Sequence, residues 1–104
     1  MYIFSITNPT FSTYNDICTF SVIGMLDDLF DYSAADLLSV MMEDVNLYYS
    51  LEYNMNKETV SLYAYLTTAD SEHIYEASLD DKTNNMFVDL CKETISATVS
   101  AVAD

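Results

Sequence analysis

The sequence is poor in glycine, proline and positive charge. Gly24 and Pro9 are the single residues of their kinds, Trp and Arg are absent, and the cationic side chains are Lys57, Lys82 and Lys92. Phosphate-binding loops and hydrolase nucleophile elbows need clustered glycines, so the usual motifs for nucleotide binding and hydrolysis are excluded. With no linker, repeat or low-complexity tract, the chain of 104 residues is expected to form one domain, residues 1–104.

Targeting segments and metal motifs are missing as well. The N-terminus has no basic region and reaches Asp16 early, and no apolar run approaches about 18 residues, so we expect neither a signal peptide nor a membrane span. Cys18 and Cys91 stand far apart without a C-x-x-C pair, which argues against zinc. They are expected to be small buried hydrophobic residues in the reducing cytoplasm of a bacterial host cell.

Few features of the sequence suggest a catalytic or metal site. His73 is the single histidine, and although Glu72 could hold it as a base, a histidine at the surface or on a strand edge is the simpler interpretation. A calcium loop starting at Asp81 would need Gly where Met86 stands and Glu where Lys92 stands. We therefore predict that the chain is not an enzyme and has no metal or cofactor.

Strand patterns dominate the chain. Residues 46–55 and 59–66 alternate apolar and polar side chains around a polar turn at 56–58, which predicts a hairpin, and 72–79 would add a third antiparallel strand. Residues 2–7 resemble a short strand that ends at Asn8-Pro9. Residues 17–24 fit either a strand or one face of a helix, and their β-branched and aromatic content favours the strand.

Two helices are predicted. In "SAADLLSVMMEDV", 33–45, Ser33 can cap the first turn and the apolar stripe consists of Leu37, Leu38, Met41, Met42 and Val45. In 83–104, with Thr83 or Asn84 as cap, the stripe consists of Phe87, Cys91, Ile95, Val99 and Val102. The predicted fold class is α+β, an antiparallel hairpin or meander sheet packed on one side by two helices.

Negative charge is what the sequence has in excess. Seventeen Asp and Glu residues give a formal net charge of −14. Solubility alone could explain an acidic surface. However, the Ile-, Tyr- and Asn-rich composition is typical of an A/T-rich coding sequence, which normally supplies lysine freely, so positive charge has been avoided here. Such a protein repels nucleic acid and anionic membranes and attracts basic partners.

The carboxylates fall in two sequence clusters, within "MLDDLFDYSAADLL" and the following "EDV", and within "ADSEHIYEASLDD". In size, charge, lack of Arg and Tyr-rich apolar content the chain resembles the small acidic DNA-mimic proteins of bacteriophages and other mobile elements, including anti-restriction and anti-CRISPR proteins. The resemblance implies a phage-type inhibitor that evades host defence by occupying the basic nucleic-acid channel of a host protein. The implied phosphate-mimicking carboxylates are Asp27, Asp28, Asp31, Asp36, Glu43, Asp44, Asp70, Glu72, Glu76, Asp80 and Asp81.

The net charge can be compared with the charge per unit length of duplex DNA. Fourteen charges correspond to roughly 24 Å of duplex DNA, and a domain of this length should be about 30 Å across. A homodimer, for which the Tyr- and Met-rich content is suited, would carry about twice that charge over about twice that length.

A second function class competes with mimicry. Tyr48, Tyr63 and Tyr65 project from the polar side of the predicted hairpin, where tyrosine is a favoured cross-strand partner. They are also candidate aromatic anchors, since tyrosine is enriched at binding hot spots. The alternative is therefore an acidic protein-protein interaction or assembly module that uses an exposed Tyr/Met surface.

Overall fold

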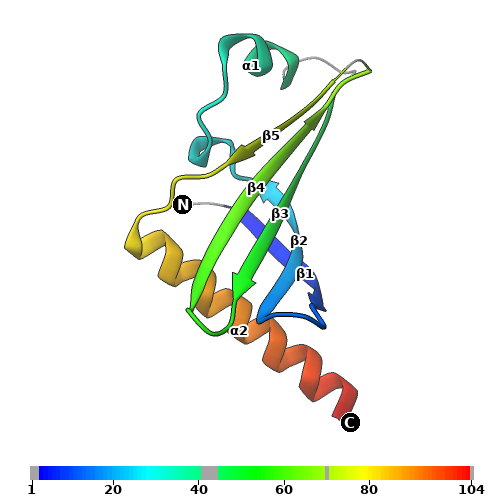
Figure 1. The fold of residues 1–104 in the computed structure, drawn as a ribbon, viewed down its shortest axis with the longest axis vertical. Helices are drawn as coiled ribbons and strands as arrows, with labels where there is room; N and C mark the ends of the chain where they lie inside the picture. The colour runs from blue at the N-terminus through cyan, green and yellow to red at the C-terminus, as the bar shows by residue number, and fades with distance from the viewer. Residues whose placement is uncertain (1–2, 41–44, 70, 104) are drawn as a thin grey trace.

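The computed structural model describes residues 3–40, 45–69 and 71–103. These residues form five strands, two α-helices and one 3-10 helix (Figure 1). Their order is β1 (Ile3–Phe11), β2 (Ile17–Met25), η1 (Asp27–Leu29), α1 (Ala34–Val40), β3 (Asn46–Asn54), β4 (Thr59–Thr67), β5 (Glu72–Glu76) and α2 (Asp81–Ala103).

The strands form one antiparallel sheet in the order β1-β2-β3-β4-β5. This is a meander in which each strand pairs with its neighbour in sequence, and it confirms the predicted α+β class. The β3–β4 hairpin is paired along its full length, from Asn46 opposite Thr67 to Asn54 opposite Thr59. Its register follows the alternating pattern, because a slip of one residue would turn every apolar side chain to the wrong face.

One face of the sheet carries the core. Phe20 of β2, Leu51 of β3 and Leu62 of β4 are fully buried on it, and α2 covers them with Phe87 and Cys91. The long α2 runs diagonally across the strands (Figure 1). Apolar side chains at period two on the strands and at helical spacing on α2 thus meet in one layer.

Residues 17–24 are a strand, as their composition favoured. Cys18, Phe20 and Val22 are buried and alternate with less buried neighbours, and β2 pairs with both β1 and β3. The helical alternative for this segment was wrong, because a helix would forfeit both sets of backbone pairing.

The prediction that Asn8-Pro9 ends the first strand was wrong, since β1 continues to Phe11. Asn8 has a positive φ of 56°, and the register shifts between Thr7 and Thr10. This β-bulge accommodates Asn8 and Pro9, so that the strand continues beyond them. Pro9 is tolerated because β1 is an edge strand, where a missing backbone donor breaks no central pairing.

The helix predicted at 33–45 is observed as α1, Ala34–Val40, while Met41, Met42, Glu43 and Asp44 lie outside the described residues. Ser33 caps it as predicted, because its Oγ accepts a hydrogen bond of 3.2 Å from the backbone N–H of Asp36. The expected buried stripe was wrong for Leu37 and Leu38, which are exposed.

The end of β5 and the start of α2 differ from the predicted bounds. β5 ends at Glu76 rather than at residue 79. α2 begins at Asp81 because Asp80 caps it, not Thr83 or Asn84. Its predicted stripe is buried only in its first half, since Val99 is exposed while the side chain of Val102 lies outside the described residues.

No helix in the described ranges 3–40, 45–69 and 71–103 is long and apolar enough to cross a membrane.

Candidate partner-binding surface

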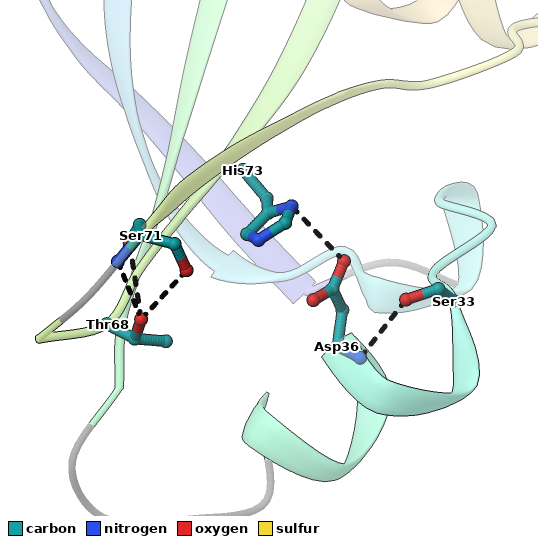
Figure 2. A network of polar contacts seen from close by, with 5 residues as sticks. All are labelled: Ser33, Asp36, Thr68, Ser71 and His73. Carbon is teal, nitrogen blue, oxygen red and sulfur yellow. Dashed lines mark hydrogen bonds and ion pairs between the residues drawn. The ribbon is translucent and has the colours of Figure 1, made fainter.

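The segments that carry the two acidic sequence clusters meet where the start of α1 lies against β5. Asp36, on the first turn of α1, has its Oδ2 3.7 Å from Nδ1 of His73 on β5. Figure 2 shows the His73 ring pointing from the strand toward the start of the helix. The nearby β4–β5 turn is closed by Thr68, whose Oγ1 accepts a hydrogen bond of 3.1 Å from the backbone N–H of Ser71.

Aromatic rings make a second connection between the same segments. Tyr32, just before α1, packs edge-on against Tyr75 of β5 with ring centroids 5.0 Å apart. Phe30 stacks on both Tyr32 and the buried Tyr49 of β3. The chain from η1 to α1 is therefore fastened to the sheet beside β5, on the same face that α2 covers.

This arrangement defines what we call the acidic end, the described carboxylates carried by the η1–α1 segment and by β5. Its members are Asp28, Asp31, Asp36, Glu72 and Glu76. All except Asp36 are exposed. The side chain of Asp27 and the predicted site residues Glu43, Asp44 and Asp70 lie outside the described residues.

Two predicted carboxylates have structural contacts of their own. Asp36 is held against His73 and its side chain is only 14% exposed. Asp80 accepts a hydrogen bond of 2.8 Å from the backbone N–H of Thr83, and its bonds to the side chain and backbone of Thr83 lower the pKa of the carboxyl. Both residues position a helix, whatever else they bind.

Two of the three lysines lie beside the β3–β4 turn, far from α1. Lys57 is in the β3–β4 turn, at the opposite end of the hairpin from α1 (Figure 1). Lys92 of α2 forms an ion pair with Glu58 in the same turn. Lys82 lies on the first turn of α2.

The second face of the sheet is not covered by a helix in the described part of the chain. Tyr48 of β3, Tyr65 of β4 and Ile74 of β5 stand in one cross-strand row. The Tyr48 and Tyr65 rings stack in parallel, with centroids 4.8 Å apart and planes at 6°. Tyr48 is 51% exposed and Ile74 is 58% exposed. The predicted placement of the tyrosines on the solvent side of the hairpin is confirmed.

Carboxylates flank this row. Glu72 lies opposite Thr67 and Glu76 opposite Tyr63, so both share the face of Tyr65 and lie diagonal to it. Partial burial and the negative charges of Glu52 and Glu72 raise the pKa of Tyr65, with burial the larger cause. We call this surface the open face and define it by Tyr48, Tyr63, Tyr65, Ile74, Glu52, Glu72 and Glu76.

Sequence reasoning missed two members of the open face. Glu52 belongs to neither acidic cluster, and Ile74 was placed in a strand without a side being assigned. The period-two pattern of residues 46–55 places Glu52 on the same face as Tyr48, but Glu52 was not included among the candidate site residues. Ile74 needed the register with Tyr65, which the sequence does not contain.

The cysteines and the histidine lie where the sequence predicted them. Cys18 and Cys91 are free and fully buried, as predicted, and burial together with the neighbouring Cys18 raises the pKa of Cys91 to about 12. His73 is exposed on an edge strand, as predicted. Within residues 3–40, 45–69 and 71–103, no three His, Cys, Asp or Glu side chains are grouped as a metal ion would require.

The observed dimensions change the comparison between the net charge per unit length and that of DNA. The molecule measures 46 × 28 × 28 Å, longer than the compact domain predicted from its length, because α2 and the meander are both extended. Averaged over the long axis, the net charge of −14 is one charge per about 3.3 Å, close to the average of one per about 3.4 Å along one DNA strand. This is about half the linear charge density of duplex DNA.

Comparisons with known proteins found no match to a family model, to a curated protein or to a solved structure. The function has to be inferred from the surfaces described above.

Proposed function

We propose that this chain is a non-catalytic, DNA-mimicking inhibitor that occupies the basic nucleic-acid-binding surface of a host protein. The observation that carries the proposal is the Asp36–His73 contact, because it holds the η1–α1 segment of the first acidic cluster against β5 of the second. Neither the η1–α1 segment nor β5 contains a lysine or arginine. A target that binds phosphates would meet carboxylates on both sides of this sheet edge, with those of η1–α1 on the face that α2 covers and Glu72 and Glu76 on the other.

The energetic basis is the same as for nucleic acid. A basic channel gains free energy when counterions around a polyanion are released, and carboxylates spaced like phosphates can replace that polyanion. The net charge averaged over the long axis is closer to the charge density of one strand than to that of a full duplex. On the compositional resemblance, we place the target in the cytoplasm of a bacterial host.

The direct test is capture followed by competition. Immobilised protein is exposed to bacterial lysate and eluted with a salt gradient, and each captured protein is assayed for displacement by duplex and by single-stranded DNA. The proposal expects a nucleic-acid-binding protein that leaves with rising salt and is displaced by DNA. A captured partner indifferent to both salt and DNA would contradict mimicry and favour the interaction-module alternative.

A further inference from the structure

The open face combines two chemical features that usually occur apart. Its centre is apolar and aromatic, with Tyr48 stacked on Tyr65 and Ile74 beside them. Ile23 follows the core residue Val22 on β2, so it lies on this side too, and it is 70% exposed. Exposed apolar patches of this kind on a sheet normally mark a contact with another molecule.

The charge on this face has one sign. Glu72 and Glu76 flank Tyr65 on the diagonal positions of β5, and Glu52 lies further along β3. Among the described residues no lysine belongs to β2, β3, β4 or β5. The occupant must therefore supply both positive charge and a surface that packs on rings.

A second copy of the chain does not satisfy this requirement. Two open faces in contact would enclose Glu52, Glu72 and Glu76 of both copies between strands β2–β5, which carry no lysine or arginine to pair with them. Like charges held together at an interface cost free energy, which weakens the contact. Nucleic acid and anionic membranes are disfavoured for the same reason.

Arginine fits the face better than lysine. Its guanidinium group is planar, stacks on aromatic rings and forms paired hydrogen bonds with a carboxylate, whereas the lysine ammonium is a compact, strongly hydrated charge. We propose that the open face binds arginine side chains of the target, stacked on the Tyr48 and Tyr65 rings and paired with the carboxylates of β5.

This inference rests on the proposed function, because it names the chemistry by which the same inhibitor would bind its target. In it the tyrosines take the place of stacked bases and the β5 carboxylates take the place of phosphates. Basic nucleic-acid-binding surfaces are rich in arginine for both interactions.

The test uses the full chain and two labelled peptides of equal length, oligoarginine and oligolysine, with affinities measured by anisotropy at moderate salt. The wild type should bind the arginine peptide more tightly. Tyr48→Ala should weaken arginine binding by about two- to fivefold, the range for one exposed cation–π contact, and should affect the lysine peptide less. Tyr48→Phe, which keeps the ring, should retain the arginine affinity.

Two matched controls separate the open face from bulk charge. Tyr14→Ala removes a ring in the β1–β2 turn that is more accessible than Tyr48, since Tyr14 is 95% exposed, and should change nothing. Glu72→Gln with Glu76→Gln should weaken arginine binding more than Asp89→Asn with Glu93→Gln on α2, although both pairs remove the same charge. Circular dichroism establishes that each variant is folded.

Three results would overturn the inference. These are equal affinity for the two peptides, equal effects of Tyr48→Ala and Tyr14→Ala, and sedimentation showing a homodimer that Tyr48→Ala dissociates. If a captured target is still displaced by DNA while Tyr48→Ala leaves arginine binding intact, the proposed function stands and this inference fails. If arginine binding follows the open face but no captured protein responds to DNA, the proposed function fails instead.

Discussion

Nδ1 of His73 lies 3.7 Å from Oδ2 of Asp36, and this contact joins two acidic segments that are far apart in the sequence. Like the ring contact between Tyr32 and Tyr75, it fixes where the charges of η1 and α1 lie relative to β5. The geometry of the acidic end thus depends on a few side chains of the sheet edge.

Replacing His73 should loosen α1 without unfolding the sheet. His73→Ala removes the partner of Asp36, and α1 buries neither Leu37 nor Leu38 in compensation. Hydrogen exchange should therefore speed up at the amides of residues 34–40 and stay unchanged in β3 and β4. The melting midpoint should move little, since partly exposed ion pairs contribute under about 1 kcal/mol. Unchanged exchange in α1 would show that His73 does not anchor it.

Asp80 should stabilise α2 in a way that depends on pH. Asp80→Ala removes the acceptor for the Thr83 N–H and should lower the melting midpoint, whereas Asp80→Ser should preserve most of the cap. Hydrogen bonding to Thr83 lowers the folded-state pKa of Asp80 below its ordinary value of 3.8. Its contribution is therefore complete above that value and is lost as the pH falls through the lower folded pKa.

Thermal melts from pH 7 to pH 2 test this, with Asp89→Ala on the same helix as the control. An Asp80→Ala variant that melts like the wild type would show that the helix needs no cap.

Cys91 should destabilise the fold at alkaline pH. Its pKa is raised from an ordinary 9.0 to about 12, so the unfolded chain loses the thiol proton first. Stability should fall by about 1.4 kcal/mol per pH unit between those values on account of this one group. Urea unfolding of wild type and Cys91→Ala from pH 8 to pH 10.5 measures it. The variant should be less stable at pH 8 but should have a shallower slope, and equal slopes would contradict the assignment.

Truncating a side chain should cost much stability on the face of the sheet that α2 covers and little on the open face. Leu62 of β4 is fully buried beneath α2, so Leu62→Ala should cost about 2–5 kcal/mol of unfolding free energy. Ile74 of β5 is mostly exposed, so Ile74→Ala should change stability by less than about 0.5 kcal/mol. Denaturant unfolding of both variants gives the comparison. A large loss for Ile74→Ala would mean that the open face is covered.

Much of the fold could be predicted because side-chain periodicity decides which face is buried. Tyr49, Leu51 and Leu62 alternate with more polar residues, and such alternation is typical of an antiparallel sheet that is covered on one face. The segments around Asn8 and Asp80 were harder, because a bulge and a cap depend on single backbone geometries that composition does not encode.

The candidate site could be predicted only in part. The sequence identified the carboxylates and the three tyrosines, since charge and strand alternation are local properties. It could not show that Asp36 meets His73, or that Tyr65 stands between Glu72 and Glu76, because both depend on the packing and register of β5. Cross-strand neighbours are contacts between residues distant in sequence, and no single-sequence pattern specifies them.

The most direct test of the account compares two triple variants with equal loss of charge in an assay of DNA displacement from the captured target. One neutralises the acidic end, with Asp28→Asn, Asp31→Asn and Glu76→Gln, and the other neutralises distant exposed sites, with Asp16→Asn, Asp89→Asn and Glu93→Gln. The account predicts that the first loses its ability to displace DNA while the second keeps most of it, both remaining folded. Equal displacement by the two variants would contradict the claim that the acidic end stands in for nucleic acid.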